Sequence, residues 1–210
     1  MTLVIGLTGG IAMGKSHAAG LFRRFGLPVF DADAAVHALF RPPSKLPLQI
    51  ERRFPGVLDT DGGVDRRRLG AAVFENAAAL RDLEGIVHPA VFESQLAFMR
   101  TAARIGVAAV VLDIPLLFEN GGERRCDLVI VVEANPWLQR QRAMARSGMT
   151  ASRLDAILAK QMPAPEKRRR ADFVLHSGYD RGASVAAIRD LLRRIDGWPE
   201  RAWPDRWLHR

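Results

Sequence analysis

The chain has 210 residues, 48% of them hydrophobic, which is enough to bury the core of one domain with insertions and too few for two large independent domains. Its net charge of +8 favours anionic partners, either nucleotide phosphates or nucleic acid. No apolar run approaches the ~20 residues of a membrane span, no secretory signal is recognisable, and the single Cys126 excludes an internal disulfide, so we expect a cytoplasmic protein that does not bind membranes.

The first half of the chain begins with a strand and a helix and is then mostly helical. The apolar run of the first strand shows no polar alternation, which is typical of a parallel strand buried on both faces. Gly26 would end the first helix, and two loops rich in Pro, Asp and Gly interrupt the later helical stretch. In chain order we predict a strand at 2–7, a helix at 14–26, a strand at 27–33, and helices between 34 and about 102, broken at 42–47 and 59–63.

The second half alternates strands and helices. Short Val-rich strands separated by helices indicate a parallel sheet that is covered by helices on both faces. The tail 196–210 holds three of the four tryptophans, which we expect to pack on the body of the protein or on a twin subunit. In chain order we predict a strand at 107–113, a loop at 114–122, a strand at 127–134, helices at 136–146 and 150–160, a basic helix leading to a strand near 173–175, and a helix at 181–195.

A phosphate-binding loop is the strongest motif of the chain. Residues 9–16, GGIAMGKS, match G-x-x-x-x-G-K-[ST] and lie between the first strand and the first helix, where the mechanism requires them. The glycines let backbone N–H groups converge on a phosphate, and the start of the helix adds its positive dipole end. Lys15 would neutralise the β- and γ-phosphates, and the Ser16 hydroxyl would coordinate Mg²⁺. The motif therefore predicts a site for a nucleoside triphosphate with Mg²⁺.

Candidates for binding the phosphate acceptor lie further along the chain. Asp31 and Asp33 close the second strand, which we expect beside the first, and a carboxylate there could take the proton of an acceptor hydroxyl or cap a helix. His88 precedes Pro89, which predicts a kink in a helical stretch, and a single histidine there is either structural or functional. Asp113 ends a buried strand, as a Walker B acid does.

Two later segments could complete the site. The loop after Asp113 would expose Leu116, Leu117 and Phe118, which we expect to line a pocket or the edge of a core. Arg142 and Arg146 share a helical face at i, i+4 in the Arg-rich segment. That face is either solvated or belongs to a lid that closes over the transferring phosphates and supplies positive charge.

Six stretches, in order from residue 3 to about 195, resemble the dephospho-coenzyme A kinase family: IGLTGGIAMGKS, VFDAD, LEGIVHP, LDIPLLFE, QRAMARSGM and QMPAPEKRRRADFVLHSG. The phosphate loop alone is shared by many kinases, but its combination with D-A-D, H-P and D-I-P-L-L-F-E is far more specific. The resemblance implies an α/β P-loop nucleoside-triphosphate-hydrolase-like fold of three layers with a central parallel sheet, plus helical acceptor-binding and lid insertions. One kinase unit would span 1–195, with a core of 1–33, 105–136 and 171–195, the acceptor-binding insertion at about 34–104, the lid at about 137–170 and a Trp-rich tail at 196–210.

The resemblance also implies the reaction and the residues that carry it. A phosphotransferase would move the γ-phosphate of ATP, with Mg²⁺, to the ribose 3′-hydroxyl of dephospho-coenzyme A, the last step of coenzyme A biosynthesis. The nucleotide would be held by Gly9, Gly10, Ile11, Ala12, Met13, Gly14, Lys15, Ser16 and His17. Catalysis would use Asp33 as the base with Lys15, Arg142 and Arg146, and Ser16 would bind Mg²⁺, with Asp113 as a second candidate ligand. The acceptor would contact Asp33, His88, Pro115, Leu116, Leu117 and Phe118.

The chain also departs from the usual family pattern. Ala12, Met13 and His17 stand where Gly, Ser and Thr are usual, so that Ala12 would cost about 1 kcal/mol if its φ is positive and Met13 would add bulk near the phosphates. His176 and Ser177 replace a common Asp-Asn pair. Two alternatives are a nucleoside monophosphate kinase and a basic nucleotide-gated protein that binds nucleic acid, although no nucleic-acid motif is recognisable. We expect a monomer or weak homo-oligomer without a nucleic-acid partner.

Overall fold

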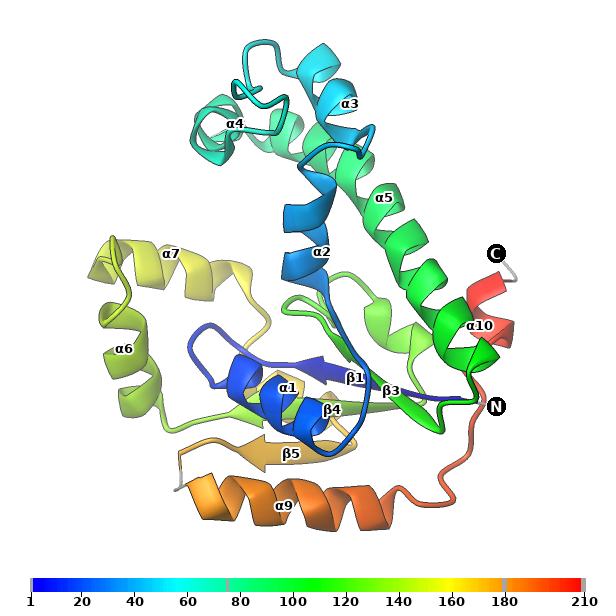
Figure 1. Cartoon of the computed structure of the whole chain (residues 1–210). Helices are drawn as coiled ribbons and strands as arrows, with labels where there is room; N and C mark the ends of the chain where they lie inside the picture. The colour runs from blue at the N-terminus through cyan, green and yellow to red at the C-terminus, as the bar shows by residue number, and fades with distance from the viewer. Residues whose placement is uncertain (1, 75, 179–180, 209–210) are drawn as a thin grey trace. The chain divides into compact units, whose positions relative to one another are not determined.

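The computed structural model describes residues 2–74, 76–178 and 181–208, so the last two residues of the predicted tail, 209–210, lie outside it. The chain divides into two compact units (Figure 1). The first unit comprises Met1–Phe30 and Ala102–Arg210, and the second comprises Asp31–Thr101. The functions predicted for the acceptor-binding insertion and the lid stay predictions.

A five-stranded sheet runs through the first unit in the order β2-β3-β1-β4-β5, within the residues that the structure describes. The strands are β1 (Leu3–Thr8), β2 (Val29–Asp31), β3 (Ala109–Asp113), β4 (Leu128–Glu133) and β5 (Phe173–His176). Strand β1 pairs in parallel with β3 and β4, and β4 pairs in parallel with β5, as the Val-rich runs predict. Because parallel strands share one direction, Asp113 and the loop after Thr8 lie at the same edge of the sheet.

The predicted second strand is wrong in its length and its neighbour. Strand β2 ends at Asp31, because helix α2 (Ala32–Leu39) begins at the next residue. The Asp31 carboxylate accepts the N–H of Ala34 at 2.9 Å, which caps a helix rich in alanine. Strand β3 lies between β2 and β1, so the second strand is not beside the first.

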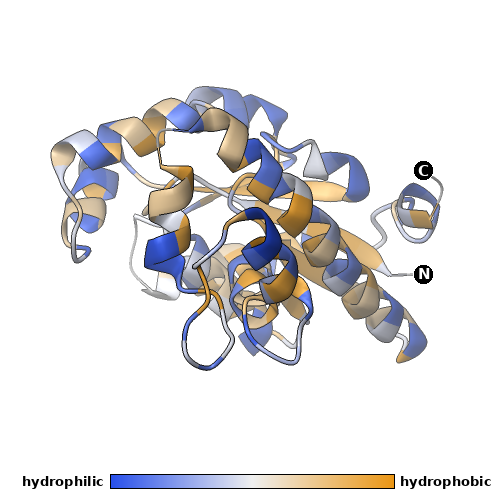
Figure 2. Cartoon of the chain, turned by 90° about the horizontal axis from the view of Figure 1, so that it is seen from above, coloured by the Kyte–Doolittle hydropathy of each residue, from blue (hydrophilic) through white to orange (hydrophobic). Residues whose placement is uncertain are grey.

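One face of the sheet packs against helices α1 (Lys15–Arg24) and α9 (Arg181–Arg194), as Figure 1 shows. Figure 2 shows the strands in the orange of hydrophobic residues and the helices in mixed colours, as expected for a sheet between two helical layers. Complete burial of a side chain such as Phe22 contributes about 1.5–3 kcal/mol. The core of this face includes Leu3, Ile5, Leu7, Phe22, Leu128, Ile130, Val132, Ile188 and Leu191.

Three helices follow β4 in the segment predicted to be a lid: α6 (Pro136–Met144), α7 (Ala151–Lys160) and α8 (Ala164–Arg170). Asn135 and Thr150 cap α6 and α7 through their side-chain oxygens. Leu154 of α7 and Ala143 of α6 form a small buried cluster with Ala12. The phosphate loop therefore packs directly on the α6–α7 pair.

The C-terminal tail packs on the first unit, as we expected of its tryptophans. After β3 a short 3-10 helix, η1 (Gly122–Arg125), leads to Asp127, whose carboxylate accepts the N–H groups of Val4, Arg201 and Ala202. Helix α10 (Asp205–Leu208) buries Trp207, whose indole N–H donates to the Arg125 carbonyl at 3.0 Å. The tail is thus fastened to the amino-terminal edge of β1 and β4.

The second unit consists of α2, α3 (Leu46–Arg53), α4 (Arg66–Val73) and α5 (Ala77–Arg104) as far as Thr101. Its core contains Ile50, Phe54 and Leu69. Helix α5 continues through Pro89 without a break, and the kink predicted at this point stays a prediction. Across the described ranges, no helix combines the length and the apolar character needed to cross a bilayer.

Candidate active site

The backbone of the phosphate loop is shaped by two left-handed residues. Gly14, at φ 89°, precedes the first residue of α1, and Ala12 has a φ of 59°. Ala12 is the one non-glycine residue with a positive φ in the described part of the chain, so the expected strain of about 1 kcal/mol applies. A Cβ on Gly9 would lie 2.5 Å from the Val132 carbonyl oxygen, so only glycine fits where the loop passes β4. The uncapped start of α1 leaves backbone donors for an anion.

Three side chains to which the sequence analysis assigned no role hold this loop in place. The Gln139 amide donates to the Ile11 carbonyl at 2.9 Å, and the Gln161 carbonyl oxygen accepts the Ile11 N–H at 3.0 Å. The Ser177 hydroxyl donates to the Met13 carbonyl at 2.6 Å. Gln161 and Ser177 lie in a stretch that resembles the family, and Gln139 lies in none. Contacts across more than 100 positions leave no periodicity in a sequence, so no local pattern indicates these hydrogen bonds.

Met13 does not add bulk to the phosphate side of the loop. Its side chain is buried, and its sulfur accepts the N–H of Ala134 at 3.0 Å. The larger residue therefore anchors the loop to the segment after β4. Ser16 and His17, in contrast, are exposed on the first turn of α1.

Lys15 forms an ion pair with Asp113. The Asp113 side chain is 3% exposed and that of Lys15 is 15% exposed. The pair joins the start of α1 to the end of β3, which lies directly beside β1. This ion pair places the lysine that is predicted to bind phosphate beside the carboxylate that is predicted to act as a Walker B acid.

The loop after Asp113 exposes fewer apolar side chains than predicted. Leu116 is 38% exposed, but Leu117 and Phe118 are buried, so the expected exposure is wrong for these two residues, and their burial agrees with the alternative that they line a core. Leu117 fills the space beside Gly6 of β1 and Gly122, whose missing side chains leave room for it. The Pro115 carbonyl accepts the Thr8 hydroxyl at 3.0 Å. The loop is therefore tied to β1 and belongs largely to the core.

A buried ion pair fixes the far end of this loop. The Lys167 ammonium group, on α8, lies 2.8 Å from Glu119 Oε1, which also accepts the Met162 N–H. Burial by itself would raise the pKa of the Glu119 carboxyl, but Lys167 and the Met162 amide hold that pKa below its usual value. The charged pair joins the loop to the last helix of the predicted lid.

The two predicted lid arginines have different surroundings. The Arg142 guanidinium donates to the Ser177 hydroxyl at 2.9 Å and to the Ser177 carbonyl at 2.8 Å. Arg142 Nη1 would also lie 3.5 Å from a Cβ built on Gly14, so Arg142 lies against the phosphate loop. Arg146, one turn later, is exposed.

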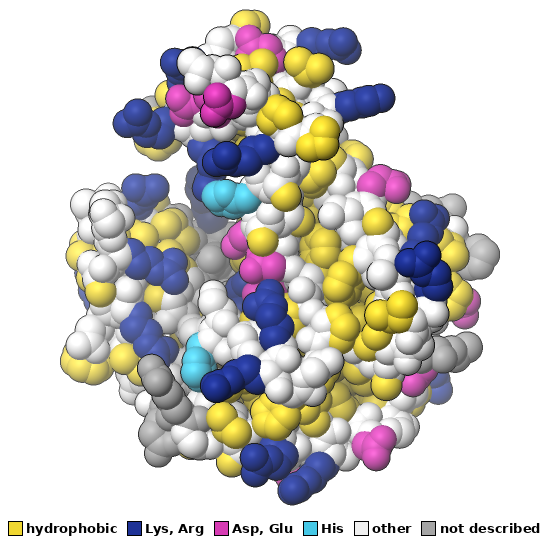
Figure 3. All heavy atoms as spheres, in the orientation of Figure 1, with side chains coloured by type: hydrophobic (Ala, Val, Ile, Leu, Met, Phe, Trp, Pro, Cys, Tyr) yellow, Lys and Arg dark blue, Asp and Glu magenta, His cyan; other side chains and the backbone are white. Residues whose placement is uncertain are grey.

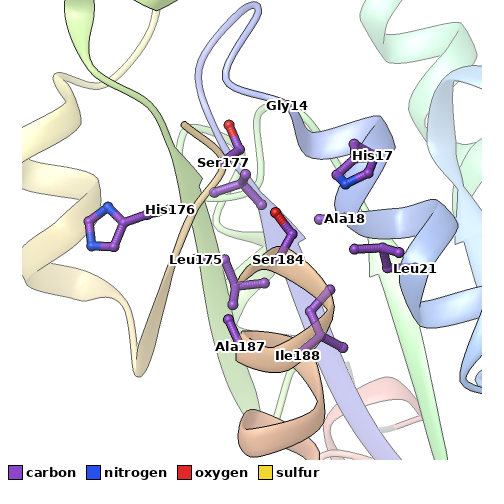
Figure 4. Close-up of a pocket in the computed structure, with 11 residues that line it drawn as sticks. Gly14, His17, Ala18, Leu21, Leu175, His176, Ser177, Ser184, Ala187 and Ile188 are labelled. Atoms are coloured by element: carbon purple, nitrogen blue, oxygen red, sulfur yellow. The ribbon is translucent and has the colours of Figure 1, made fainter. Parts of the chain in front are cut away.

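A small pocket lies beside the loop, between α1, β5 and α9 (Figure 4). Its cavity volume is about 20 Å³, which is room for a water molecule. In Figure 4 the His176 ring points away from the other labelled side chains, in agreement with its contact to Glu133 at 3.2 Å. The lining residues are Gly14, His17, Ala18, Leu21, Val132, Leu175, His176, Ser177, Ser184, Ala187 and Ile188.

The remaining candidates belong to the second unit. Asp33 lies in the first turn of α2 and not in a strand, and it is Asp31 that caps this helix. His88 lies within α5. The roles of Asp33 and His88 toward a substrate stay predictions.

Ser16 and Asp113, the predicted ligands of Mg²⁺, carry the oxygen donors that this ion prefers. Mg²⁺ binds hard oxygen donors, keeps several waters and takes few protein ligands. The exposed Ser16 hydroxyl and the Asp113 carboxylate are such donors. No group of three or more His, Cys, Asp or Glu side chains suited to a metal occurs among the described residues, and a Mg²⁺–nucleotide site does not need one.

Comparisons with known proteins bear on the family. A family model described as dephospho-CoA kinase matches residues 3–180. A dephospho-CoA kinase of Nitrobacter winogradskyi is 47% identical over 95% of this chain and 98% of that protein. The crystal structure of TT1252 from Thermus thermophilus matches with a TM-score of 0.79 at 36% identity, over 92% of this chain and 98% of that one. A dephospho-CoA kinase structure from Campylobacter jejuni matches with a TM-score of 0.65 at 25% identity, over 92% and 97%.

Proposed function

This chain belongs to the dephospho-CoA kinase family, and on that premise we propose that it transfers the γ-phosphate of ATP to the ribose 3′-hydroxyl of dephospho-coenzyme A. ADP and coenzyme A are the products, so the reaction is the last step of coenzyme A biosynthesis. The observation that carries the proposal is the match of the family to residues 3–180, which include the phosphate loop and both arginines of the predicted lid.

The nucleotide half of the site is formed by the loop 9–14 and the start of α1. Backbone N–H groups of this segment donate to the β- and γ-phosphates, and the Lys15 ammonium group neutralises their charge. This role is supported by the left-handed φ of Gly14 and by the side chains that fix the carbonyls of Ile11 and Met13. The exposed position of His17 suits contact with the nucleotide.

Ser16 and Asp113 would hold Mg²⁺ together with phosphate oxygens and water. When bound, the ion supplies positive charge that is shared between the phosphates. Ser16 is the residue after Lys15 on the first turn of α1, and the Lys15 ammonium group is paired with the Asp113 carboxylate. This pairing supports the proposal, because it brings Asp113 to the start of α1.

Asp33 would act as the base that takes the proton of the ribose 3′-hydroxyl. Transfer to an alcohol needs such an acceptor within hydrogen-bond reach of the attacking oxygen. Because Asp31 is engaged as the cap of α2, Asp33 is the better candidate of the two carboxylates.

The acceptor would be bound by His88 and by the loop after Asp113. Leu116 is exposed and Pro115 is partly exposed, so these two residues can contact a ligand directly. Leu117 and Phe118 are buried and would support the shape of the loop from below. Arg142 and Arg146 would supply positive charge to the transferring phosphate from α6 and the turn after it, with Arg142 already beside Gly14.

We propose that the protein is a monomer or a weak homo-oligomer and that it acts in the cytoplasm. We do not propose nucleic acid as a partner, because the sequence carries no recognisable nucleic-acid-binding motif. On the face that Figure 3 shows, Lys and Arg side chains are interspersed with other side chains.

The function is tested with a panel of acceptors. Purified protein is given Mg·ATP and, in separate reactions, dephospho-coenzyme A, CMP, UMP, AMP or GMP, and ADP release is measured. We expect fast turnover with dephospho-coenzyme A alone. Preferential turnover of a nucleoside monophosphate would replace the proposal with the alternative kinase.

A further inference from the structure

Ser177 connects three parts of the first unit that are far apart in the sequence. It follows β5 directly, its hydroxyl donates to the Met13 carbonyl at 2.6 Å, and the same hydroxyl accepts a hydrogen bond from Arg142 at 2.9 Å. Its carbonyl accepts a second hydrogen bond from Arg142 at 2.8 Å. A hydroxyl has one proton to donate and lone pairs to accept, so both hydrogen bonds can form at once.

The bond to Met13 fixes the orientation of a peptide group in the phosphate loop. In a trans peptide the C=O and the following N–H point in opposite directions. When the Met13 carbonyl points at Ser177, the N–H of Gly14 must point to the opposite side of the loop. Ser177 therefore controls the direction of one backbone donor of the loop.

The approach of Ser177 to this peptide is unusually close. A Cβ on Gly14 would lie 2.6 Å from Ser177 Oγ and 2.8 Å from Ser177 Cβ. The contact thus depends on the absence of a side chain at Gly14. The Arg142 guanidinium lies over the same place, 3.5 Å from that Cβ position.

We propose that Ser177 is a positioning residue of the kinase site: its hydroxyl orients the Met13–Gly14 peptide and holds Arg142 against the phosphate loop. One amide donor and one cation are thereby set in place before the triphosphate binds. This inference rests on the proposed function. The proposal also assigns a role to Ser177, one of the two residues that replace the Asp-Asn pair common in the family.

The experiment separates nucleotide binding from turnover. The full-length Ser177→Ala variant is compared with the wild type in its affinity for Mg²⁺ and β,γ-methylene-ATP, by calorimetry, and in kcat with ATP and dephospho-coenzyme A. We expect affinity to fall about tenfold, since a peptide carbonyl and a guanidinium lose a shared partner. The Ser177→Thr variant keeps the hydroxyl and should recover most of the affinity. Ser152→Ala, which removes an exposed hydroxyl of α7, should behave as the wild type.

A double-mutant comparison tests the link to Arg142. If Ser177 acts through Arg142, then Arg142→Ala lowers kcat by a smaller factor in the Ser177→Ala background than in the wild type. Equal factors in the two backgrounds, or a Ser177→Ala variant within twofold of the wild type in both affinity and kcat, would overturn the proposal. Binding of the ATP analogue requires no acceptor, so a wild type that binds it without phosphorylating dephospho-coenzyme A refutes the proposed function and leaves the affinity test of Ser177 intact.

Discussion

Lys15 and Asp113 form an ion pair that joins the start of α1 to the carboxyl end of β3. The Asp113 carboxylate is almost completely buried and its partner is largely buried. The cation that would neutralise a triphosphate is therefore already placed by a carboxylate that could share in binding Mg²⁺. Loss of either member changes the charge of the site by one unit.

The Lys15→Ala substitution should abolish phosphate transfer and also lower stability. It removes a phosphate-binding cation, which we expect to reduce kcat/KM at least a hundredfold. It also removes the ion-pair partner that Lys15 provides for the buried Asp113 carboxylate, which should lower the stability by about 3 kcal/mol. Steady-state kinetics and urea unfolding measure the two effects. Lys45→Ala, at an exposed lysine, is the control, and near-normal turnover by Lys15→Ala would refute the role of the loop.

The Asp33→Asn substitution should separate chemistry from nucleotide binding. An amide has the size of the carboxylate but takes up no proton, so kcat should fall about 10²–10⁴-fold while the affinity for Mg·ATP stays nearly unchanged. Asp31→Asn is the matched control, because asparagine caps a helix as well as aspartate does. Full turnover by Asp33→Asn, together with loss of turnover in Asp31→Asn, would move the base to Asp31.

The Gly14→Ala substitution should be far more harmful than Gly26→Ala. The φ angle is 89° at Gly14 and 85° at Gly26, so alanine at either position would carry a similar backbone strain of about 1 kcal/mol. Only at Gly14 would the new Cβ collide with a neighbour, Ser177 Oγ at 2.6 Å, whereas Gly26 has nothing within 4 Å. We expect Gly14→Ala to lose measurable Mg·ATP binding in calorimetry. Equal affinities of the two variants would contradict the close approach of Ser177 to the loop.

The Asp127→Asn substitution should loosen the C-terminal tail. The carboxylate accepts three backbone N–H groups, and an amide replaces one acceptor oxygen by a donor, so stability should fall by about 2 kcal/mol. Denaturant unfolding followed by tryptophan fluorescence measures the loss. The exposed Asp61→Asn should stay within about 0.5 kcal/mol of the wild type. An unchanged midpoint in Asp127→Asn would show that the tail does not depend on this carboxylate.

The parts of the fold that could be predicted are those with strong local patterns. The apolar runs of β1, β3 and β4 and the phosphate loop before α1 occur where the sequence indicates them. The positive φ at Ala12 could be anticipated because glycine is usual there in the family. The boundary of an element is not set by a single pattern where two local preferences compete. Asp31 serves both as a strand end and as a helix cap, and the cap determines where β2 ends.

The parts that could not be predicted depend on long-range packing. From the sequence, Leu117 and Phe118 are expected to be exposed in a loop, but both are buried. Leu117 is a core residue because Gly6 and Gly122, which lack side chains, leave space for it. The order of the sheet, with β3 beside β1, is likewise not encoded in any local pattern. Ser177 looked like a departure from the family, and its contacts with Met13 and Arg142 bridge elements that are more than 30 residues apart.

The position of the transferred phosphate tests the central claim most directly. The wild-type protein is incubated with Mg²⁺, ATP labelled in its γ-phosphate and dephospho-coenzyme A, and the product is examined by phosphorus–proton correlation NMR. If the γ-phosphate is transferred to the ribose 3′-hydroxyl, the product carries a single labelled phosphate, and its phosphorus couples to the ribose 3′ proton. Label found only in inorganic phosphate, or attached at any other position of the acceptor, would contradict it.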